Sequence, residues 1–482
     1  MKSNVDWRRW AVTACCIATF ATTIIDASST KASAEALFDT ATAAEMRAAP
    51  PSGGTMREGL RGSSDGSLRN RLVSLNTGEL ARIVPTGVDN ARNRLERANN
   101  LSRAVILDLF PGVRVTAQRK DIEAPEEGGY IWAGESDGNE PAFVTLVINN
   151  NEVLGHIQAD GKLYSIEPVS GRLHRIIEID QSKMLPDQHL KVPPGFFRER
   201  GETAEPPAEA ADPKVVTTIK VLVANTANAR NECLAGGTLA QDQSCMQQRI
   251  NLAINLSNQA FTRSGVQIKF IRVGGQNEVN YPDTTVYGAN TENNYTGILC
   301  DLSNFANCFG TGNNKTTSFN AVRAKREQFD ADLVVLMRKG GQSCGVAWVP
   351  DPPTAGTSDQ GFSVTTSTKG GFYNCIEGNT FAHETGHNMG LHHDRYVEPR
   401  APNSKFNYGY VDSAPAGRFR EIMSYPNKCA ATGGRACRLI PYFSTPEKFY
   451  NGRKIGILPN QPGAADGARR LNVTRATVGA YR

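Results

Sequence analysis

The sequence predicts a chain of α+β and α/β class with two folded parts: a β-rich domain in residues 35–192 and, after a linker in residues 193–214, an α/β domain in residues 215–482. Apolar runs separated by turn residues fill the first part, a proline- and glutamate-rich stretch follows it, and strands alternate with helical stripes in the last part. With 482 residues, 39% hydrophobic and 21% charged, the chain has globular composition and exceeds the length of one ordinary domain.

Residues 1–34 are typical of a signal peptide. Lys2, Arg8 and Arg9 precede an uncharged, mostly apolar run at 10–25, and residues 32–34, Ala-Ser-Ala, form a small-x-small cleavage pattern. A membrane anchor is the alternative, but a helix needs about 20 apolar residues to span a bilayer and this run is shorter. We expect cleavage near residue 34, a secreted protein that is extracellular or periplasmic in transit, and no membrane attachment after cleavage.

The β-rich domain is expected to be an antiparallel meander. Turn signals separate its apolar runs, among them Asp-Gly at 137–138 and 160–161 and Ser-Gly at 170–171. The runs that predict strands are residues 113–115, 143–148, 153–157, 163–166 and 173–179. A charged helix is expected at residues 88–104.

Beyond the linker the hydrophobic period changes. Residues 219–223 alternate, a helical stripe at 250–261 ends at Gly265, residues 266–270 alternate again, and residues 332–337 form a nearly all-apolar run. Alternating strands and helices of this kind predict a twisted, mixed sheet covered by helices.

The cysteines divide in the same way. Cys15 and Cys16 lie in the signal segment, and the other eight all lie beyond residue 232, which predicts four disulfides in an exported domain. Eight cysteines permit 105 connectivities, of which near-neighbour pairing is the simplest. It joins Cys233 with Cys245, Cys300 with Cys308, Cys344 with Cys375, and Cys429 with Cys437. A cysteine-ligated metal is disfavoured because the chain has no Cys-x-x-Cys pair.

Charge separates at the linker too. Residues 215–482 carry 28 Lys or Arg against 19 Asp or Glu, whereas residues 35–214 carry 21 against 27. The two parts are electrostatically complementary, either by chance and solubility or because they bind each other. The sequence has no nucleic-acid motif, and aromatic residues do not interleave with the basic ones, so no nucleic-acid partner is expected.

Four of the seven histidines lie within Phe381-Ala-His-Glu-Thr-Gly-His-Asn-Met-Gly-Leu-His-His-Asp394. On a helix, His383 and His387 project from one face about one turn apart, so both can reach one tetrahedral metal ion. Gly390 permits the positive φ that ends the helix and lets His393 arrive as a third ligand. Three protein ligands predict a catalytic Zn²⁺ site with an open fourth position. The only argument for a role of His392 is that it is adjacent to His393, so we expect His392 to lie beside the site or on the surface.

Glu384 follows the first of these histidines and is the candidate general base. A zinc ion lowers the pKa of its water to about 7, so a neighbouring carboxylate can take the proton and later pass it to a leaving amine. The alternative is a histidine-rich helix end with a solvated glutamate, which five specified residues at fixed spacing make improbable.

The motif resembles that of the metzincin metallopeptidases, and the resemblance covers roughly residues 215–482. It implies a metzincin-type catalytic domain with an active-site helix, and a zinc endopeptidase, a hydrolase of protein and peptide substrates. Arg420-Glu-Ile-Met-Ser-Tyr425 resembles the family's Met-turn, with Met423 beneath the histidines. By resemblance to astacin-like and serralysin-like members, Tyr425 would approach the zinc and steady the oxyanion. Asp394 instead matches the reprolysin or adamalysin branch, so the branch stays open.

Other segments extend the resemblance. Cys344-Gly-Val-Ala-Trp348 and Phe362-Ser-Val-Thr-Thr366 are similar to the segments that lead to the family's substrate-binding edge strand, where an extended peptide pairs. Tyr442-Phe-Ser-Thr-Pro446 and Tyr450-Asn-Gly452 are similar to the bacterial peptidyl-Asp metalloendopeptidases. That similarity implies cleavage before acidic residues. The candidate carboxylate-binding side chains are Arg418, Arg420, Lys428, Arg435 and Arg438.

A secreted protease needs latency, and the acidic part of the chain is the candidate inhibitor of its basic partner. We therefore expect an inactive precursor in which residues 35–192 act as a propeptide. This segment has no cysteine, so a ligand that blocks the zinc must be a carboxylate or an imidazole. Asp187 and His189 are the candidates, although two exposed polar residues in a loop would look the same.

Three alternatives remain at the level of sequence. A metzincin-like protease with a hydrophobic pocket would share the zinc chemistry but not the preference for Asp. A non-proteolytic adhesin or toxin component on the same scaffold is disfavoured because neither Glu384 nor a zinc histidine is lost. A non-haem iron oxygenase would use two histidines and one carboxylate rather than three histidines. Structural Ca²⁺ is left open.

Overall fold

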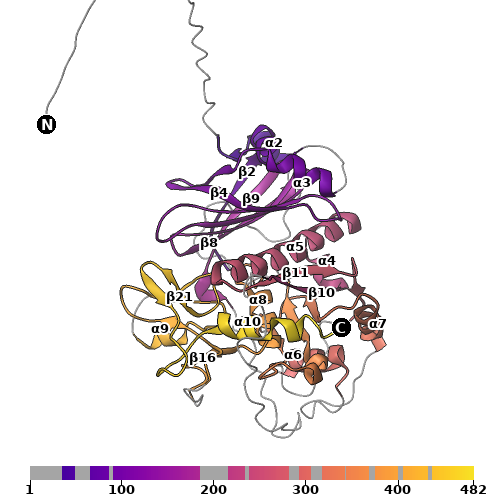
Figure 1. Ribbon diagram of the computed structural model, residues 1–482. Coiled ribbons are helices and arrows are strands. Elements are labelled where there is room, and N and C mark those ends of the chain that lie inside the picture. Colours follow the sequence, from indigo (N-terminus) through magenta and orange to yellow (C-terminus); the bar gives the residue numbers. More distant parts are fainter. Residues whose placement is uncertain are drawn as a thin grey trace, which may run out of the picture. The chain divides into compact units, whose positions relative to one another are not determined.

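The structure is a computed structural model (Figure 1), and it describes residues 35–48, 66–85, 91–184, 215–233, 238–281, 293–305, 317–341, 343–367, 375–399, 405–432 and 437–482. The expected signal peptide, the linker, Asp187 and His189 lie outside these residues. Among the described helices, none is long and apolar enough to cross a bilayer.

A nine-stranded antiparallel sheet forms the N-terminal half of the described chain, in the order β1-β2-β9-β8-β7-β6-β5-β4-β3. Its strands are β1 Phe38–Thr40, β2 Ser67–Leu75, β3 Ala104–Phe110, β4 Val113–Glu123, β5 Tyr130–Glu135, β6 Phe143–Asn149, β7 Glu152–Ala159, β8 Lys162–Ser170 and β9 Leu173–Ile179. All five strands predicted from apolar runs are present, whereas β1, β2, β3 and β5 were not predicted.

Three short helices accompany this sheet: α1 Ala43–Ala48, α2 Thr77–Ile83 and α3 Ala91–Asn99. The prediction of a helix at 88–104 was wrong at its C-terminal end, because the apolar run that begins at Ala104 pairs with β4 as strand β3. Side chains of β5 alternate between two layers. Trp132 packs in one core with residues of α2 and α3, and Ile131 on the opposite face joins the core of the C-terminal half.

The C-terminal half is built on a mixed sheet in the order β11-β10-β13-β15-β14, with β12 also pairing β10. The strands are β10 Thr217–Thr226, β11 Ile268–Val273, β12 Glu278–Val279, β13 Leu333–Arg338, β14 Gly345–Ala347 and β15 Phe362–Thr366. All pairs are parallel except β14 with β15, so β14 is an antiparallel edge strand. The predicted mixed sheet is confirmed.

Helices cover both faces of the mixed sheet. Val221 and Val223 of β10 pack with α5 Leu239–Ser264, whereas Leu222 and Ala224 pack with α6 Asn293–Ser303 and α7 Asn320–Gln328 on the other face. Helix α5 begins with a capping box between Thr238 and Gln241, and it ends at Gly265 with φ 74°, as predicted.

Helix α8 Thr380–Asn388, which carries the first two histidines of the motif, and the remaining, mostly short elements complete the fold. These elements are β16 His392–Asp394, β17 Tyr408–Gly409, β18 Val411–Asp412, β19 Phe419–Arg420, α4 Ala227–Asn231, α9 Asn427–Ala431, β20 Arg438–Leu439, β21 Thr445–Tyr450, β22 Arg453–Ile455 and α10 Gly467–Val478. Three of the predicted disulfides are present: Cys233–Cys245, Cys344–Cys375 and Cys429–Cys437. The fourth includes Cys308, which lies outside the described residues.

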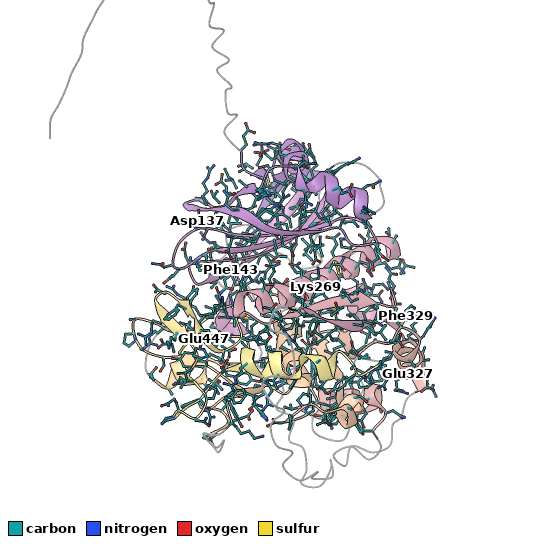
Figure 2. All side chains as sticks on the ribbon, viewed as in Figure 1. Asp137, Phe143, Lys269, Glu327, Phe329 and Glu447 are labelled. Carbon is teal, nitrogen blue, oxygen red and sulfur yellow. A yellow bond between two sulfur atoms is a disulfide. The ribbon has the colours of Figure 1, made fainter. Side chains whose placement is uncertain are left out.

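The nine-stranded sheet packs against α5 through β5, β6 and β7 (Figure 1). Ile131, Val147 and Leu154 of these strands enter the core that contains α5. Phe143 of β6, labelled in Figure 2, packs with residues of the C-terminal region and lies 4.2 Å below the guanidinium of Arg263. Residues Glu35–Arg482 accordingly form one compact unit.

Four ion pairs between described residues join the two halves, and each has the same polarity: the carboxylate comes from the N-terminal half and the cation from the C-terminal half. They are Glu123–Lys269 at 3.0 Å, Glu127–Arg272 at 3.7 Å, Glu140–Arg438 at 2.7 Å and Glu167–Arg249 at 3.6 Å. The complementarity expected from the charge counts is therefore present in the contacts.

Candidate metal and catalytic site

Helix α8 carries the first two histidines of the motif and packs between α5 and strands β14 and β15. It follows Asn379, which has the left-handed φ of 63°. The chain turns at Gly390, where φ is +90° and an added Cβ would lie 2.7 Å from Cδ of Pro353. Both the φ and the space therefore require glycine, and the turn brings His393 on β16 back toward the helix.

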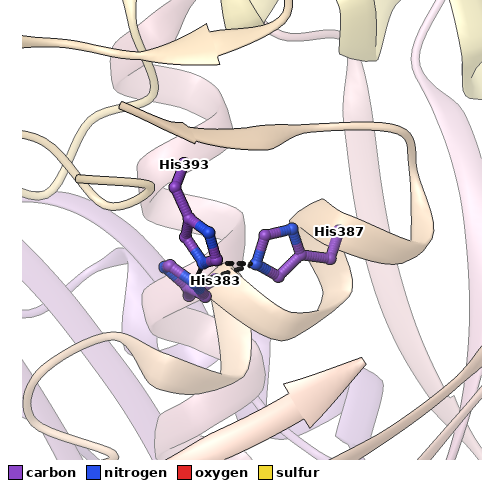
Figure 3. A group of neighbouring side chains, drawn as sticks. All are labelled: His383, His387 and His393. Carbon is purple, nitrogen blue, oxygen red and sulfur yellow. Dashed lines mark hydrogen bonds between the residues drawn. The ribbon is translucent and has the colours of Figure 1, made fainter. Parts of the chain in front are cut away.

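The three histidines meet at one point, drawn in Figure 3. Their Nε2 atoms are 3.0 Å apart for His383 and His387, 3.0 Å for His387 and His393, and 3.2 Å for His383 and His393. A tetrahedral ion at about 2.0–2.1 Å from three nitrogens needs nitrogens roughly 3.3–3.4 Å apart. The group, fully buried, thus has nearly the spacing that such an ion requires.

The other ring nitrogen of each histidine faces an oxygen. Nδ1 of His383 donates to the carbonyl of Ile422 at 2.8 Å, and Nδ1 of His387 donates to the carbonyl of Leu391 at 2.7 Å. A carbonyl only accepts, so the proton of each ring sits on Nδ1 and leaves the Nε2 lone pair directed at the shared point. Burial and the neighbouring His383 hold the pKa of His387 well below its usual value, which keeps it in this neutral form. Two neutral imidazoles with convergent lone pairs, and the third ring nitrogen beside them, fit a divalent metal such as zinc.

Glu384 lies buried on the same helix, one residue after the first histidine. Its carboxylate packs against Gly345 of the edge strand β14, where an added Cβ would lie only 2.4 Å from Oε1. Gly345 therefore makes room for the candidate base. No local pattern indicates this role in advance, because a glycine after a cysteine has many explanations.

The segment predicted to be a Met-turn lies beneath the helix. Sδ of Met423 sits against Gly386 of α8, where a Cβ would approach it to 2.9 Å. The hydroxyl of Tyr425 lies 3.2 Å from Nε2 of His393, and the backbone N–H of Tyr425 donates to Oδ2 of Asp394 at 2.9 Å. Asp394 thus holds the backbone of the tyrosine whose ring faces the metal ligands, so the two features that pointed to different branches act together here.

Comparison with known proteins agrees with this geometry. Residues 215–445 match the model of the reprolysin-like metallopeptidase family M12B. The peptidyl-Asp metalloendopeptidase of Stenotrophomonas maltophilia (strain R551-3) is 30% identical over 393 residues, which cover 77% of this chain and 81% of that protein. The chain belongs to the reprolysin-like M12B metallopeptidases.

Two further similarities were found. The peptidyl-Asp metalloendopeptidase of Xanthomonas campestris pv. campestris is 25% identical over 397 residues, 78% of this chain and 82% of that protein. Metalloproteinase-II from Bacteroides fragilis is similar in structure over 68% of this chain and 90% of its own, at 11% identity and a TM-score of 0.36. The family membership confirms the prediction of a metalloendopeptidase, a hydrolase that acts on proteins or peptides.

Sequence reasoning missed Glu398 of this metallopeptidase. Its Oε1 accepts from Nδ1 of His393 at 2.9 Å, and its Oε2 lies 3.1 Å from Nδ1 of His392. His392 therefore lies beside the site, which was one of the two positions expected for it. Its Nε2 faces Asp351 at 3.1 Å. These two carboxylates raise the pKa of His392 to about 9 against the opposing effect of burial. The sequence signal that could have indicated Glu398 is an acidic residue a few positions after the third histidine.

Glu421 was also missed. It is fully buried next to Met423, and its carboxylate accepts backbone N–H groups of Tyr410 at 3.0 Å and Ser444 at 3.0 Å. It also accepts the backbone N–H of Met423 at 3.3 Å. Burial raises the pKa of Glu421 to about 7. The Met-turn of this metallopeptidase is therefore fastened by one carboxylate to two other segments of the chain.

The candidate carboxylate-binding cations lie in different surroundings. Nη1 of Arg420 donates to the carbonyl of Ser424 at 2.8 Å, directly before Tyr425. Nζ of Lys428 donates to the carbonyl of Val411 at 3.1 Å, and Arg438 pairs with Glu140 in the loop between β5 and β6. Arg418 is half-buried and has φ 45°. Arg435 lies outside the described residues. Arg420 is thus the candidate whose hydrogen bond reaches the residue next to Tyr425, and the Tyr425 hydroxyl in turn contacts His393.

Proposed function

We propose that this metallopeptidase is a secreted zinc endopeptidase, made as an inactive precursor, in which His383, His387 and His393 hold the ion and Glu384 is the general base. The observation that carries the proposal is the convergence of three buried Nε2 atoms within 3.0–3.2 Å. Their number leaves a tetrahedral ion one open position, as catalytic rather than structural sites do.

When bound, zinc supplies a Lewis acid that polarises a peptide carbonyl and lowers the pKa of a water to about 7. The carboxylate of Glu384 accepts the proton from the attacking water and returns it to the amine nitrogen that leaves. The hydroxyl of Tyr425 donates to the carbonyl oxygen as negative charge develops there, a stabilisation that such donors provide most strongly in the transition state. The edge strand β14 offers backbone groups to an extended substrate.

Replacing the proposed base separates binding from chemistry. Glu384→Gln should retain about one zinc ion per chain and lose nearly all turnover, because an amide cannot take up the proton. Zinc is counted by elemental analysis, and turnover by cleavage of a defined protein. Glu447→Gln, an exposed carboxylate labelled in Figure 2, is the matched control and should keep both. Wild-type rates in Glu384→Gln would remove Glu384 from the proposal.

We further propose that cleavage occurs before acidic residues, chiefly Asp. The names of the relatives and the cationic side chains around the Met-turn support this specificity, and Arg420 is the side chain we assign to the substrate carboxylate. A guanidinium binds a carboxylate through two parallel hydrogen bonds. Peptides that differ only at the residue after the cleaved bond test the proposal. Faster cleavage before Leu or Phe than before Asp would instead indicate a hydrophobic pocket.

The precursor state is proposed from the contacts of the N-terminal sheet. Four carboxylates of the N-terminal half pair with cations of α5, β11 and β20, and the apolar face of its sheet packs on α5, so residues 35–192 can hold the catalytic half as a bound inhibitor. A foreign protease site placed in the linker permits a test on the intact chain. Activity should stay low after the linker is cut and rise when high salt and gel filtration separate the halves. High activity before any cut would exclude a precursor.

A further inference from the structure

We propose that Glu398 is a positioning residue for the third metal ligand: it fixes the ring of His393 through Nδ1 and makes its Nε2 a stronger donor. The inference rests on the proposed metal site, and it concerns a carboxylate that lies outside the metal-binding motif. Oε1 of Glu398 accepts both the ring Nδ1–H of His393 at 2.9 Å and the backbone N–H of the same residue at 3.3 Å.

The third ligand differs from the other two in its support. His383 and His387 belong to a helix, and backbone carbonyls accept their Nδ1–H groups. His393 lies on the three-residue strand β16, whose pairing with β17 shifts register between His392 and Asp394. A short, irregular strand constrains a ring less than a helix does, so the direction of this Nε2 depends on the side-chain acceptor. A charged acceptor on the far nitrogen also raises the basicity of the ligating one.

Glu398 is itself held in place from two sides. Its backbone N–H donates to the carbonyl of Asp394 at 3.1 Å, and its Oε2 lies 3.1 Å from Nδ1 of His392. The ring of His392 stacks on Tyr408 with centroids 5.1 Å apart, and its Nε2 meets Asp351 at 3.1 Å. The carboxylate that orients the ligand therefore belongs to a connected series of groups.

Asp351 anchors that series to the rest of the fold. It accepts from Nζ of Lys405 at 3.2 Å and from the fully buried Arg470 of α10 at 3.4 Å. These cations and His392 hold the pKa of Asp351 well below its usual range, although burial opposes them. The position of the third ligand is thus linked through Glu398 to α10, near the end of the chain.

The test measures zinc affinity by competition with a chelator in Glu398→Ala and Glu398→Gln, both in the Glu384→Gln background to prevent self-cleavage. We expect Glu398→Ala to bind zinc about 10- to 100-fold more weakly. Glu398→Gln should recover part of the loss, because its amide oxygen still accepts from Nδ1 of His393. Melting of the metal-free proteins serves as the folding control, and Glu447→Ala as the surface control.

The outcomes separate the two proposals. If the Glu384→Gln parent binds no zinc, the metal site itself is wrong. Suppose instead that the parent binds zinc, and that metal-free Glu398→Ala melts at the same temperature as the metal-free parent. If Glu398→Ala then binds zinc as tightly as the parent, the positioning role is overturned while the metal site stands. If metal-free Glu398→Ala melts at a lower temperature than the parent, Glu398→Gln supplies the test. A zinc affinity of Glu398→Gln equal to that of Glu398→Ala, both measured per folded molecule, would overturn the positioning role.

Discussion

Acid should weaken the attachment of the N-terminal sheet through His156 of β7. This ring is buried, and its Nε2 donates to the carbonyl of Glu377, three residues before α8, at 3.0 Å. Burial, and to a lesser degree the charge of Arg263, lower the pKa of His156 from 6.5 to about 4. The folded protein therefore keeps the ring neutral at pH values where the unfolded chain has already bound a proton.

The sign and size of the effect follow from that difference. A depressed histidine pKa contributes stability that is complete above the unfolded value of 6.5 and is lost as the pH falls toward about 4. A shift of this size corresponds to about 3 kcal/mol, of which about 2 kcal/mol should be lost between neutral pH and about pH 4.5. His156→Gln keeps a donor for the carbonyl of Glu377 and removes the titration.

Urea unfolding of the Glu384→Gln protein, followed by tryptophan fluorescence at both pH values, measures this contribution. The free energy of unfolding should fall by about 2 kcal/mol more in the parent than in His156→Gln. The buried His174, whose pKa is also lowered to about 4, is present in both proteins and cancels in the difference. Equal pH dependence of the parent and His156→Gln would refute the reasoning.

Three other results are expected. Tyr425→Phe should lower kcat about 100-fold while zinc content by elemental analysis stays unchanged, because it removes a donor to the developing oxyanion. Gly345→Ala should lower kcat/KM at least about 10-fold with little change in Tm, since its Cβ displaces the proposed base that it would approach to 2.4 Å. Glu167→Gln should cost about 2–4 kcal/mol in urea unfolding because it breaks a buried pair, whereas Glu140→Gln, in a half-exposed pair, should cost less than about 1 kcal/mol.

Features that depend on residues close together in the chain could be predicted from the sequence. His383 and His387 meet because a helix sets their separation, and Gly390 is needed where the chain turns toward His393. Gly265 marked the end of α5. The near-neighbour disulfides likewise join cysteines that are close in the chain, so little backbone has to be placed for the pairing to be predicted.

Features that depend on segments distant in the chain could not be predicted in this way. Gly345 matters because β14 passes the carboxylate of α8, and no local pattern records that approach. His156 and Arg249 are ordinary in sequence, and only the packing of the N-terminal sheet against the C-terminal half gives each of them a partner in the other half. Strand β3 was missed for a related reason: its apolar run becomes a strand by pairing with β4.

The position of the metal ligands in the chain has a consequence for biosynthesis. The last strand of the nine-stranded sheet ends at Ile179, and the first ligand is His383, so 204 residues (383 − 179) separate them. At about 5–20 residues per second, a ribosome synthesises the last strand of the sheet roughly 10–40 s before it reaches the ligands. The acidic sheet is therefore available to the nascent basic half before a site able to cut peptides can assemble.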